Sequence, residues 1–178
     1  MLINKILKIT VILALLLAEL PYSVQAYEVA ATPYDNRLKQ CGVFGQPYEW
    51  LVAHSIPEAS MQILFNEARS FRYVAEPDTD HWQTAEETSQ KHSGDCEDKA
   101  IWLFNRLTKA GYSQLKLVIG KQREIDAQMH VWLTYEDSSG RIFLLDPTAQ
   151  RKIWALSDLS EGWYQPIYAF DGLKRYRF

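Results

Sequence analysis

Three residues that could serve as a nucleophile, a base and an orienting acid follow one another along the chain: Cys96, His130 and Asp146. A cysteine attacks as its thiolate, and a neighbouring imidazole can take the thiol proton. A carboxylate on the other ring nitrogen fixes the tautomer of the imidazole and supports its positive form. These residue types therefore predict acyl transfer through a Cys-His-Asp triad.

The acids around Cys96, in the stretch SGDCEDKA, raise a question about its ionisation. Negative neighbours disfavour a thiolate, whereas the N-terminus of a helix favours one through its dipole and its unpaired N–H groups. Asp95 is a suitable N-cap, Asp98 has the capping-box spacing, and Gly94 breaks the chain before them. We therefore expect Cys96 in the first turn of a helix, with backbone N–H groups that could form an oxyanion hole.

Helical spacing of apolar residues supports this placement. The stripe after Cys96 consists of Ala100, Ile101, Phe104 and Leu107, and Gly111 is the expected C-cap. A second helix is predicted from Pro57 to about Ser70, and a third begins at Thr84, where Thr84 and Glu87 have capping-box spacing.

Beyond residue 111 the apolar period changes to two, which predicts strands over residues 115–119, 128–135 and 141–146. The last two form a hairpin around a loop within residues 136–140. If Tyr135 pairs with Arg141, His130 lies directly opposite Asp146, with Cβ atoms ~5 Å apart. A register shifted by two leaves His130 and Asp146 diagonal to each other and within reach. A shift by one puts the two side chains on opposite faces of the sheet.

The first 26 residues have the pattern of a cleavable secretory signal. Lys5 and Lys8 precede an apolar run over residues 9–17, and small residues close the segment. The run is shorter than the ~20 residues of a spanning helix, and no cysteine follows it directly to carry a lipid. We expect signal cleavage to leave a single domain over residues 27–178, periplasmic or secreted, without stable membrane insertion.

Composition excludes some partners. The net charge of −3 at pH 7 gives no reason to expect nucleic acid or an anionic membrane as a partner. Six Trp and ten Tyr suit a dense core or a binding cleft. Residues 27–50, with their prolines and glycines, are expected to be irregular or to form an N-terminal arm.

Other uses of the cysteines stay open at this point. A Cys41–Cys96 disulfide would fit a secreted chain, and would make the protein a non-catalytic periplasmic domain that binds protein or peptidoglycan. Otherwise Cys41 is a buried apolar residue or a free thiol. A metal site of His81, His92 and Cys96 is a further alternative, although no tight ligand spacing appears.

The sequence resembles the transglutaminase-like superfamily in three successive motifs: GDCEDKA at 94–100, MHVW at 129–132 and LLDP at 144–147. Two other blocks are also similar, at 81–87 and 164–170. The resemblance spans roughly residues 71–178 and is closest to the bacterial transglutaminase-like cysteine proteinases.

This resemblance implies a papain-like α+β fold, in which the nucleophile lies at a helix N-terminus packed on an antiparallel sheet. It implies that Cys96 attacks a protein amide, that His130 acts as base and then as acid, and that Asp146 orients His130. Water as the acceptor makes the protein a cysteine peptidase, whereas an amine would make it a transglutaminase. Some members of this branch clip large surface adhesins, so a protein substrate of that kind is implied. Pro147 stands where those enzymes carry asparagine.

The resemblance also raises the question of calcium. In the adhesin-clipping enzymes, acids beside the cysteine help to bind this ion, and Asp95 and Glu97 match them by position. Calcium takes six to eight oxygen ligands, and the remaining ligands cannot be named from the sequence. Helix capping by an exposed acid is the favoured interpretation, and the chemistry itself requires no cofactor.

Overall fold

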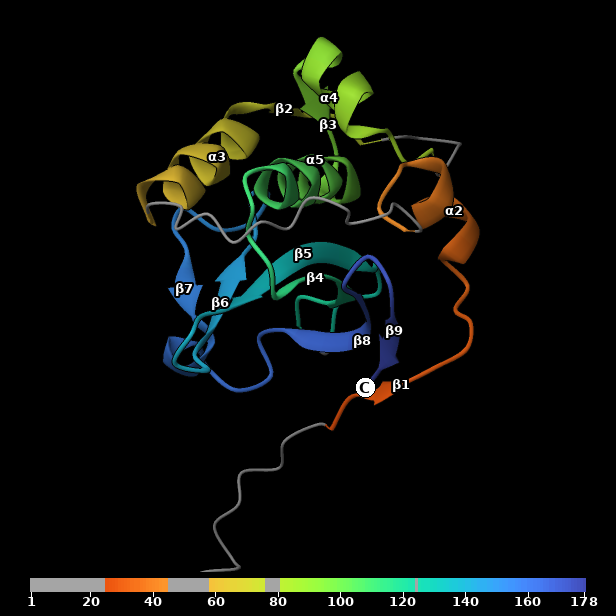
Figure 1. Ribbon diagram of the computed structural model, residues 1–178, viewed down its shortest axis with the longest axis vertical. Helices are drawn as coiled ribbons and strands as arrows, with labels where there is room; N and C mark the ends of the chain where they lie inside the picture. Colours follow the sequence, from red (N-terminus) through yellow and green to blue (C-terminus); the bar gives the residue numbers. More distant parts are fainter. Residues whose placement is uncertain (1–24, 45–57, 76–80, 124) are drawn as a thin grey trace, which may run out of the picture.

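The computed structural model describes residues 25–44, 58–75, 81–123 and 125–178. Helices α3, α4 and α5 lie on one side of a long curved sheet, with α2 beside them (Figure 1). The expected secretory signal lies outside the described residues except for its last two. Among the described residues, no helix has the length and apolar character needed to cross a membrane.

The three predicted helices are confirmed. The helices are α2 (Asp35–Gln40), α3 (Glu58–Ser70), α4 (Ala85–Lys91), α5 (Cys96–Lys109) and a short 3-10 turn, η1 (Leu156–Asp158). Thr84 caps α4 in the expected box, because its hydroxyl accepts from the Glu87 N–H (3.2 Å) and its own N–H donates to the Glu87 carboxylate (2.7 Å). After α5, Gly111 adopts φ +89°, as its role past the helix end requires.

The irregular arm expected over residues 27–50 is wrong in its described part, which contains a strand and the helix α2. The six residues of α2 are too few to show an apolar period. The helix is held instead by one fully buried side chain, Leu38.

The strands form an antiparallel sheet of seven in the order β1-β9-β8-β4-β5-β6-β7, and a separate parallel pair, β2-β3. Their bounds are β1 Tyr27–Glu28, β2 Arg72–Tyr73, β3 Ser93–Gly94, β4 Leu115–Lys121, β5 His130–Glu136, β6 Ile142–Leu145, β7 Trp154–Ala155, β8 Gln165–Phe170 and β9 Arg175–Arg177. The predicted strands are β4, β5 and β6. Together these elements confirm the α+β class and the helix packed on an antiparallel sheet.

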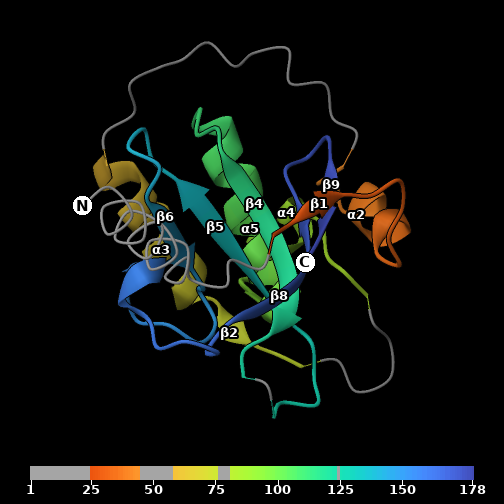
Figure 2. The ribbon, with the colours of Figure 1, turned by 90° about the horizontal axis from the view of Figure 1, so that it is seen from below.

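The main core lies between α5 and the central strands β4 and β5, which overlie α5 in Figure 2. Its fully buried members there include Ile101, Leu103, Leu107, Leu117, Ile119 and Leu133. Intervening residues of β4 and β5, Val118 and Trp132, face the other way and form a second cluster with Leu144 of β6 and Ala169 of β8. This alternation is the period-two pattern expected of strands with apolar residues on both faces.

The hairpin register differs from the predicted one by two residues. Leu133 pairs with Leu145 and Tyr135 with Phe143, so Asp146 is diagonal to His130 rather than opposite it. The ladder runs further because Asp137 N–H donates to the carbonyl of Arg141 (2.9 Å), leaving a three-residue loop that ends at Gly140 (φ +82°). A shift by two keeps both side chains on one face, so the predicted pair survives the error.

Gly120 lies in β4 opposite the first residue of β5. It pairs with His130 on one side and with Pro166 on the other, at a register shift between β4 and β8. A Cβ at this position would collide with the carbonyl oxygen of Gln165 and approach the Trp132 ring to 2.7 Å. Both neighbours are held by the sheet, so only glycine fits between them.

We therefore expect Gly120→Ala to lower the free energy of unfolding by about 3 kcal/mol, the upper end for overpacking in a core. Gly140→Ala is the matched control, since its Cβ meets no atom within 4 Å and it bears only the left-handed φ penalty, about 1 kcal/mol. Urea unfolding measures both. Equal losses in the two variants would contradict this account of Gly120.

Candidate active site

Cys96 is the first residue of α5, and the preceding Asp95 is the N-cap. Asp98 closes the capping box by accepting the Asp95 N–H at 3.3 Å. The predicted helix start is therefore confirmed to the residue, and it places the thiol over the positive end of the helix dipole.

Asp98 also has a wider role that the sequence pattern did not indicate. Its side chain is 1% exposed and accepts from both the backbone N–H (2.8 Å) and the side-chain amide of Gln83. A Cβ on Gly94 would lie 2.5 Å from the Asp98 Cβ, which explains the glycine. One buried carboxylate thus ties the segment before α4 to the turn that presents Cys96. Gln83 lies in the 81–87 block. The resemblance of that block to the superfamily did not indicate the contact between Gln83 and Asp98.

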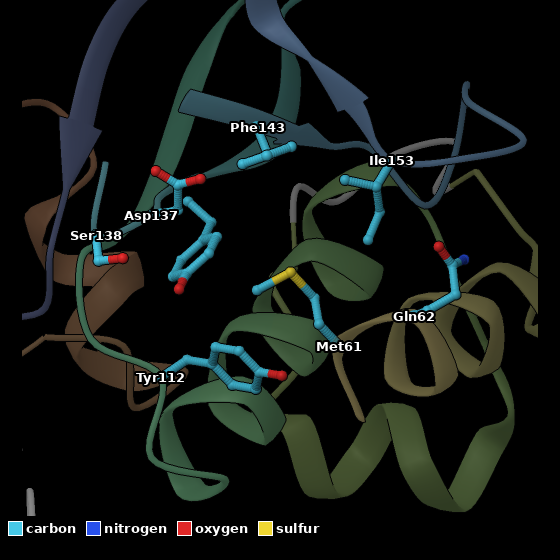
Figure 3. A pocket seen from close by; sticks show the side chains of 8 residues that line it. Met61, Gln62, Tyr112, Asp137, Ser138, Phe143 and Ile153 are labelled. Carbon is cyan, nitrogen blue, oxygen red and sulfur yellow. The ribbon is translucent and has the colours of Figure 1, made fainter. Parts of the chain in front are cut away.

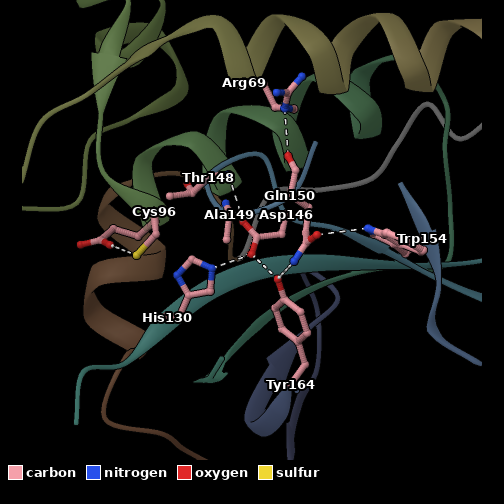
Figure 4. A network of polar contacts seen from close by, with 10 residues as sticks. Arg69, Cys96, His130, Asp146, Thr148, Ala149, Gln150, Trp154 and Tyr164 are labelled. Carbon is pink, nitrogen blue, oxygen red and sulfur yellow. Dashed lines mark hydrogen bonds and ion pairs between the residues drawn. The ribbon is translucent and has the colours of Figure 1, made fainter. Parts of the chain in front are cut away.

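His130 and Asp146 meet at one end of the sheet. His130 begins β5, Asp146 directly follows β6, and the Nε2 of the imidazole lies 2.7 Å from Oδ2 of the carboxylate. The ring stacks on Trp132, with centroids 6.0 Å apart. Because Nε2 faces the carboxylate, Nδ1 is left toward the sulfur of Cys96, and Figure 4 shows the thiol and the ring pointing at each other.

Asp146 is completely buried, and its carboxylate accepts four hydrogen bonds. Oδ1 receives the backbone N–H groups of Thr148 and Ala149, both at 2.9 Å, and Oδ2 receives His130 and the hydroxyl of Tyr164 (2.6 Å). Burial alone would raise the pKa of Asp146, but the hydrogen bonds and charge of these partners outweigh it and hold the pKa below its usual range. The carboxylate is therefore ionised and able to support an imidazolium.

The surroundings of Cys96 raise the pKa of its thiol. Burial is the largest cause that raises its pKa, followed by the charge and hydrogen bond of Glu97, while the Val131 backbone N–H acts in the opposite direction. The thiol donates to Glu97 Oε2 at 3.0 Å. Of the acids near Cys96, Glu97 therefore opposes the thiolate directly, and Asp98 has its carboxylate engaged by Gln83.

Cys96 and His130 open onto one cleft, and Asp146 is buried behind His130. A hollow of about 620 Å³ is lined by Tyr73, Cys96, Gln122, Ile125, Asp126, Ala127, Gln128, Met129, His130, Thr148 and Ala149. The segment between β4 and β5 forms one wall, and Tyr73 and Cys96 belong to the helical side. A separate hollow of about 500 Å³ lies between the β5-β6 hairpin and α3, around Met61, Tyr112 and Phe143 (Figure 3). It contains none of the three predicted catalytic side chains.

Both cysteines are free, so the structure does not contain the Cys41–Cys96 disulfide of the alternative interpretation. Burial raises the pKa of Cys41 to about 11, and its thiol contacts the carbonyl of Leu38 at 3.6 Å. His81 lies 3.8 Å from Glu87, and His92 packs edge-on against Phe71.

Within the described ranges, no group of three or more His, Cys, Asp or Glu side chains could hold a metal ion. The alternative site of His81, His92 and Cys96 is therefore not assembled. Asp95 and Glu97 offer too few oxygens by themselves for calcium, which takes six to eight.

Comparison with solved structures identifies the fold. The chain superposes on Legionella pneumophila LapG with a TM-score of 0.57, 21% identity, and coverage of 81% of this chain and 75% of LapG. A calcium-bound LapG structure gives 0.54, 22%, 77% and 71%, and an EGTA-treated one gives 0.58, 20%, 81% and 73%. The sequence matches no protein-family model and no curated protein. The chain therefore shares its fold with LapG.

The contact between Glu97 and the thiol leads to a first prediction for the site. Glu97→Gln removes the charge that raises the pKa of Cys96, so more thiolate forms at pH 7 and iodoacetamide labels Cys96 about tenfold faster, as expected for one pKa unit. Mass spectrometry of the Cys96 peptide measures the rate. Glu86→Gln, on the exposed first turn of α4, is the charge-matched control and leaves the rate unchanged. Equal rates in all three proteins would contradict the inhibitory role of Glu97.

Proposed function

We propose that residues 27–178 form one exported domain, a cysteine peptidase that hydrolyses protein amide bonds through Cys96, His130 and Asp146. One observation carries the proposal: the imidazole is fixed at Nε2 by a buried, ionised carboxylate, and its Nδ1 is turned toward a thiol at a helix N-terminus. The fold shared with LapG supports the same class of chemistry. The signal pattern in the first 26 residues supports export to a periplasm or beyond.

The first half of the reaction uses the thiol and both ring nitrogens of the imidazole. The Cys96 thiol turns from Glu97 to Nδ1 of His130 and transfers its proton there, while the sulfur attacks the substrate carbonyl carbon. Asp146 accepts the hydrogen bond from Nε2 and supports the imidazolium. The backbone N–H of Cys96, in the first turn of α5, is suited to receive the carbonyl oxygen as it becomes negative.

The second half reverses these roles. His130 gives its Nδ1 proton to the departing amine, so the peptide bond breaks and the acyl group stays on Cys96 as a thioester. A water then enters, loses a proton to Nδ1 and attacks the thioester. The carboxylic acid leaves, and the proton returns to the sulfur.

A protein segment in extended form suits the cleft, because the cleft is open and is lined on both sides by side chains of intermediate or full exposure. Tyr73, Ile125 and Met129 supply apolar contact surface at 55%, 83% and 37% exposure. Surface adhesins are the substrate class that the sequence resemblance suggests, and they would be met by an exported enzyme. The proposed steps use only residues of this chain and water, and the described carboxylates near Cys96 do not assemble a calcium site.

The peptidase proposal is tested by adding the mature protein to a periplasmic extract and sequencing the new protein N-termini. We expect a small set of new termini with the wild-type protein and none with Cys96→Ala or His130→Ala. Adding a labelled primary amine to the same reaction distinguishes hydrolysis from transamidation. Label incorporation without new termini, or identical termini with Cys96→Ala, would refute the peptidase.

The role of Asp146 has its own test. Asp146→Asn removes the charge that supports the imidazolium, and we expect cleavage at the new sites to fall by at least about 10²-fold. Asp171→Asn is the control, because Asp171 accepts two backbone N–H groups and a tyrosine hydroxyl in the same way, but at a different turn. Comparable activity in the two variants would exclude a special role for Asp146.

A further inference from the structure

The chain builds the same carboxylate–tyrosine unit twice. In each unit an aspartate directly follows a strand, and one carboxylate oxygen accepts the N–H groups two and three residues later. The other oxygen accepts a tyrosine hydroxyl from a later segment. For Asp146 these distances are 2.9, 2.9 and 2.6 Å, the last to Tyr164. For Asp171 they are 2.9, 2.7 and 2.8 Å, the last to Tyr176.

The two units differ in one respect that bears on chemistry. At Asp146 the oxygen that receives the tyrosine also receives His130 Nε2 at 2.7 Å. Tyr164 and His130 therefore hold the same oxygen, and together with the two backbone N–H groups they use all four acceptor positions of the carboxylate. The aspartate cannot turn away from His130 without breaking its bond to Tyr164.

Tyr164 is itself held in place. Gln150 donates from its side-chain nitrogen to the phenol oxygen at 3.0 Å, and the Gln150 oxygen accepts Trp154 Nε1 at 3.1 Å. The Gln150 carbonyl accepts Arg69 Nε from α3 at 2.9 Å, and the Tyr164 ring packs edge-on to Trp132, with centroids 5.0 Å apart. Figure 4 shows this chain of contacts running from α3 to His130. Burial, then the charge of Asp146, raise the pKa of Tyr164, so the phenol remains a donor.

We propose that Tyr164 is a positioning residue for the triad: it fixes Oδ2 of Asp146 against His130 and so keeps Nδ1 of the imidazole directed at Cys96. This inference rests on the proposed function and extends it to a residue that touches neither the thiol nor the imidazole.

Two opposing effects follow from removing the hydroxyl. Oδ2 would keep more of its charge, which favours the imidazolium and faster reaction. Oδ2 would also lose a short bond from a buried site, which frees the carboxylate to turn. A hydrogen bond to a charged group is worth at least tenfold in an equilibrium constant, whereas the extra charge acts on an ion that Asp146 already pairs. The loss of orientation therefore dominates.

The test compares Tyr164→Phe with Tyr176→Phe, two variants that each lose one phenol–carboxylate bond. We expect iodoacetamide labelling of Cys96 at pH 7 to be roughly tenfold slower in Tyr164→Phe and unchanged in Tyr176→Phe. In ¹⁵N-labelled protein, the proton signal of His130 Nε2–H should broaden in Tyr164→Phe, because the proton exchanges with water faster, and remain sharp in Tyr176→Phe. Similar melting temperatures in the two variants show that the difference is not one of stability.

Wild-type labelling together with a sharp imidazole signal in Tyr164→Phe would overturn the inference and leave Tyr164 as a loop anchor. If Tyr164→Phe does not fold, Gln150→Leu replaces it, since it keeps the phenol but removes its donor. A slower reaction with a broadened signal in that variant supports the inference, and no change in either refutes it.

Both readouts need no substrate. A protein that responds to Tyr164→Phe but cleaves nothing would therefore refute the peptidase and leave this inference standing.

Discussion

The site depends on one buried carboxylate. Asp146 can remain ionised without solvent because four donors surround it, two from its own turn and two from separate strands or loops. Each donor also fixes a part of the fold: the turn after β6, the start of β5 and the segment before β8. Burial of an unpaired carboxylate would destabilise the fold. Because Asp146 is paired with four donors, its carboxylate instead connects the elements around the cleft.

Part of this arrangement could be predicted from local pattern. The start of α5 at Cys96 followed from Asp95, Asp98 and Gly94, because caps and breaks are set by neighbouring residues. The His130–Asp146 pair followed from strand parity, which survives an error of two in register. The register itself could not be predicted, since it depends on how the Asp137 side chain and backbone close the hairpin loop.

Contacts between segments distant in sequence were not predictable. Gln83 reaches Asp98 from before α4, and Tyr164 reaches Asp146 across 18 residues. Strands β1 and β7 contain two residues each, too few to show a period, and β8 includes a proline. Their places in the sheet are set by pairing with longer strands. The resemblance of the 164–170 block to the superfamily located Tyr164 without indicating what its hydroxyl contacts.

The contact between Glu97 and the thiol also bears on how easily Cys96 is oxidised. Peroxides and disulfides react with thiolates far faster than with thiols, and oxidation beyond sulfenic acid is irreversible in most settings. A cysteine that stays protonated is a poor target for such reagents. Glu97 would then lower the reactivity of the resting thiol and slow its oxidation. The sulfur would be open to oxidation mainly when it is turned toward His130.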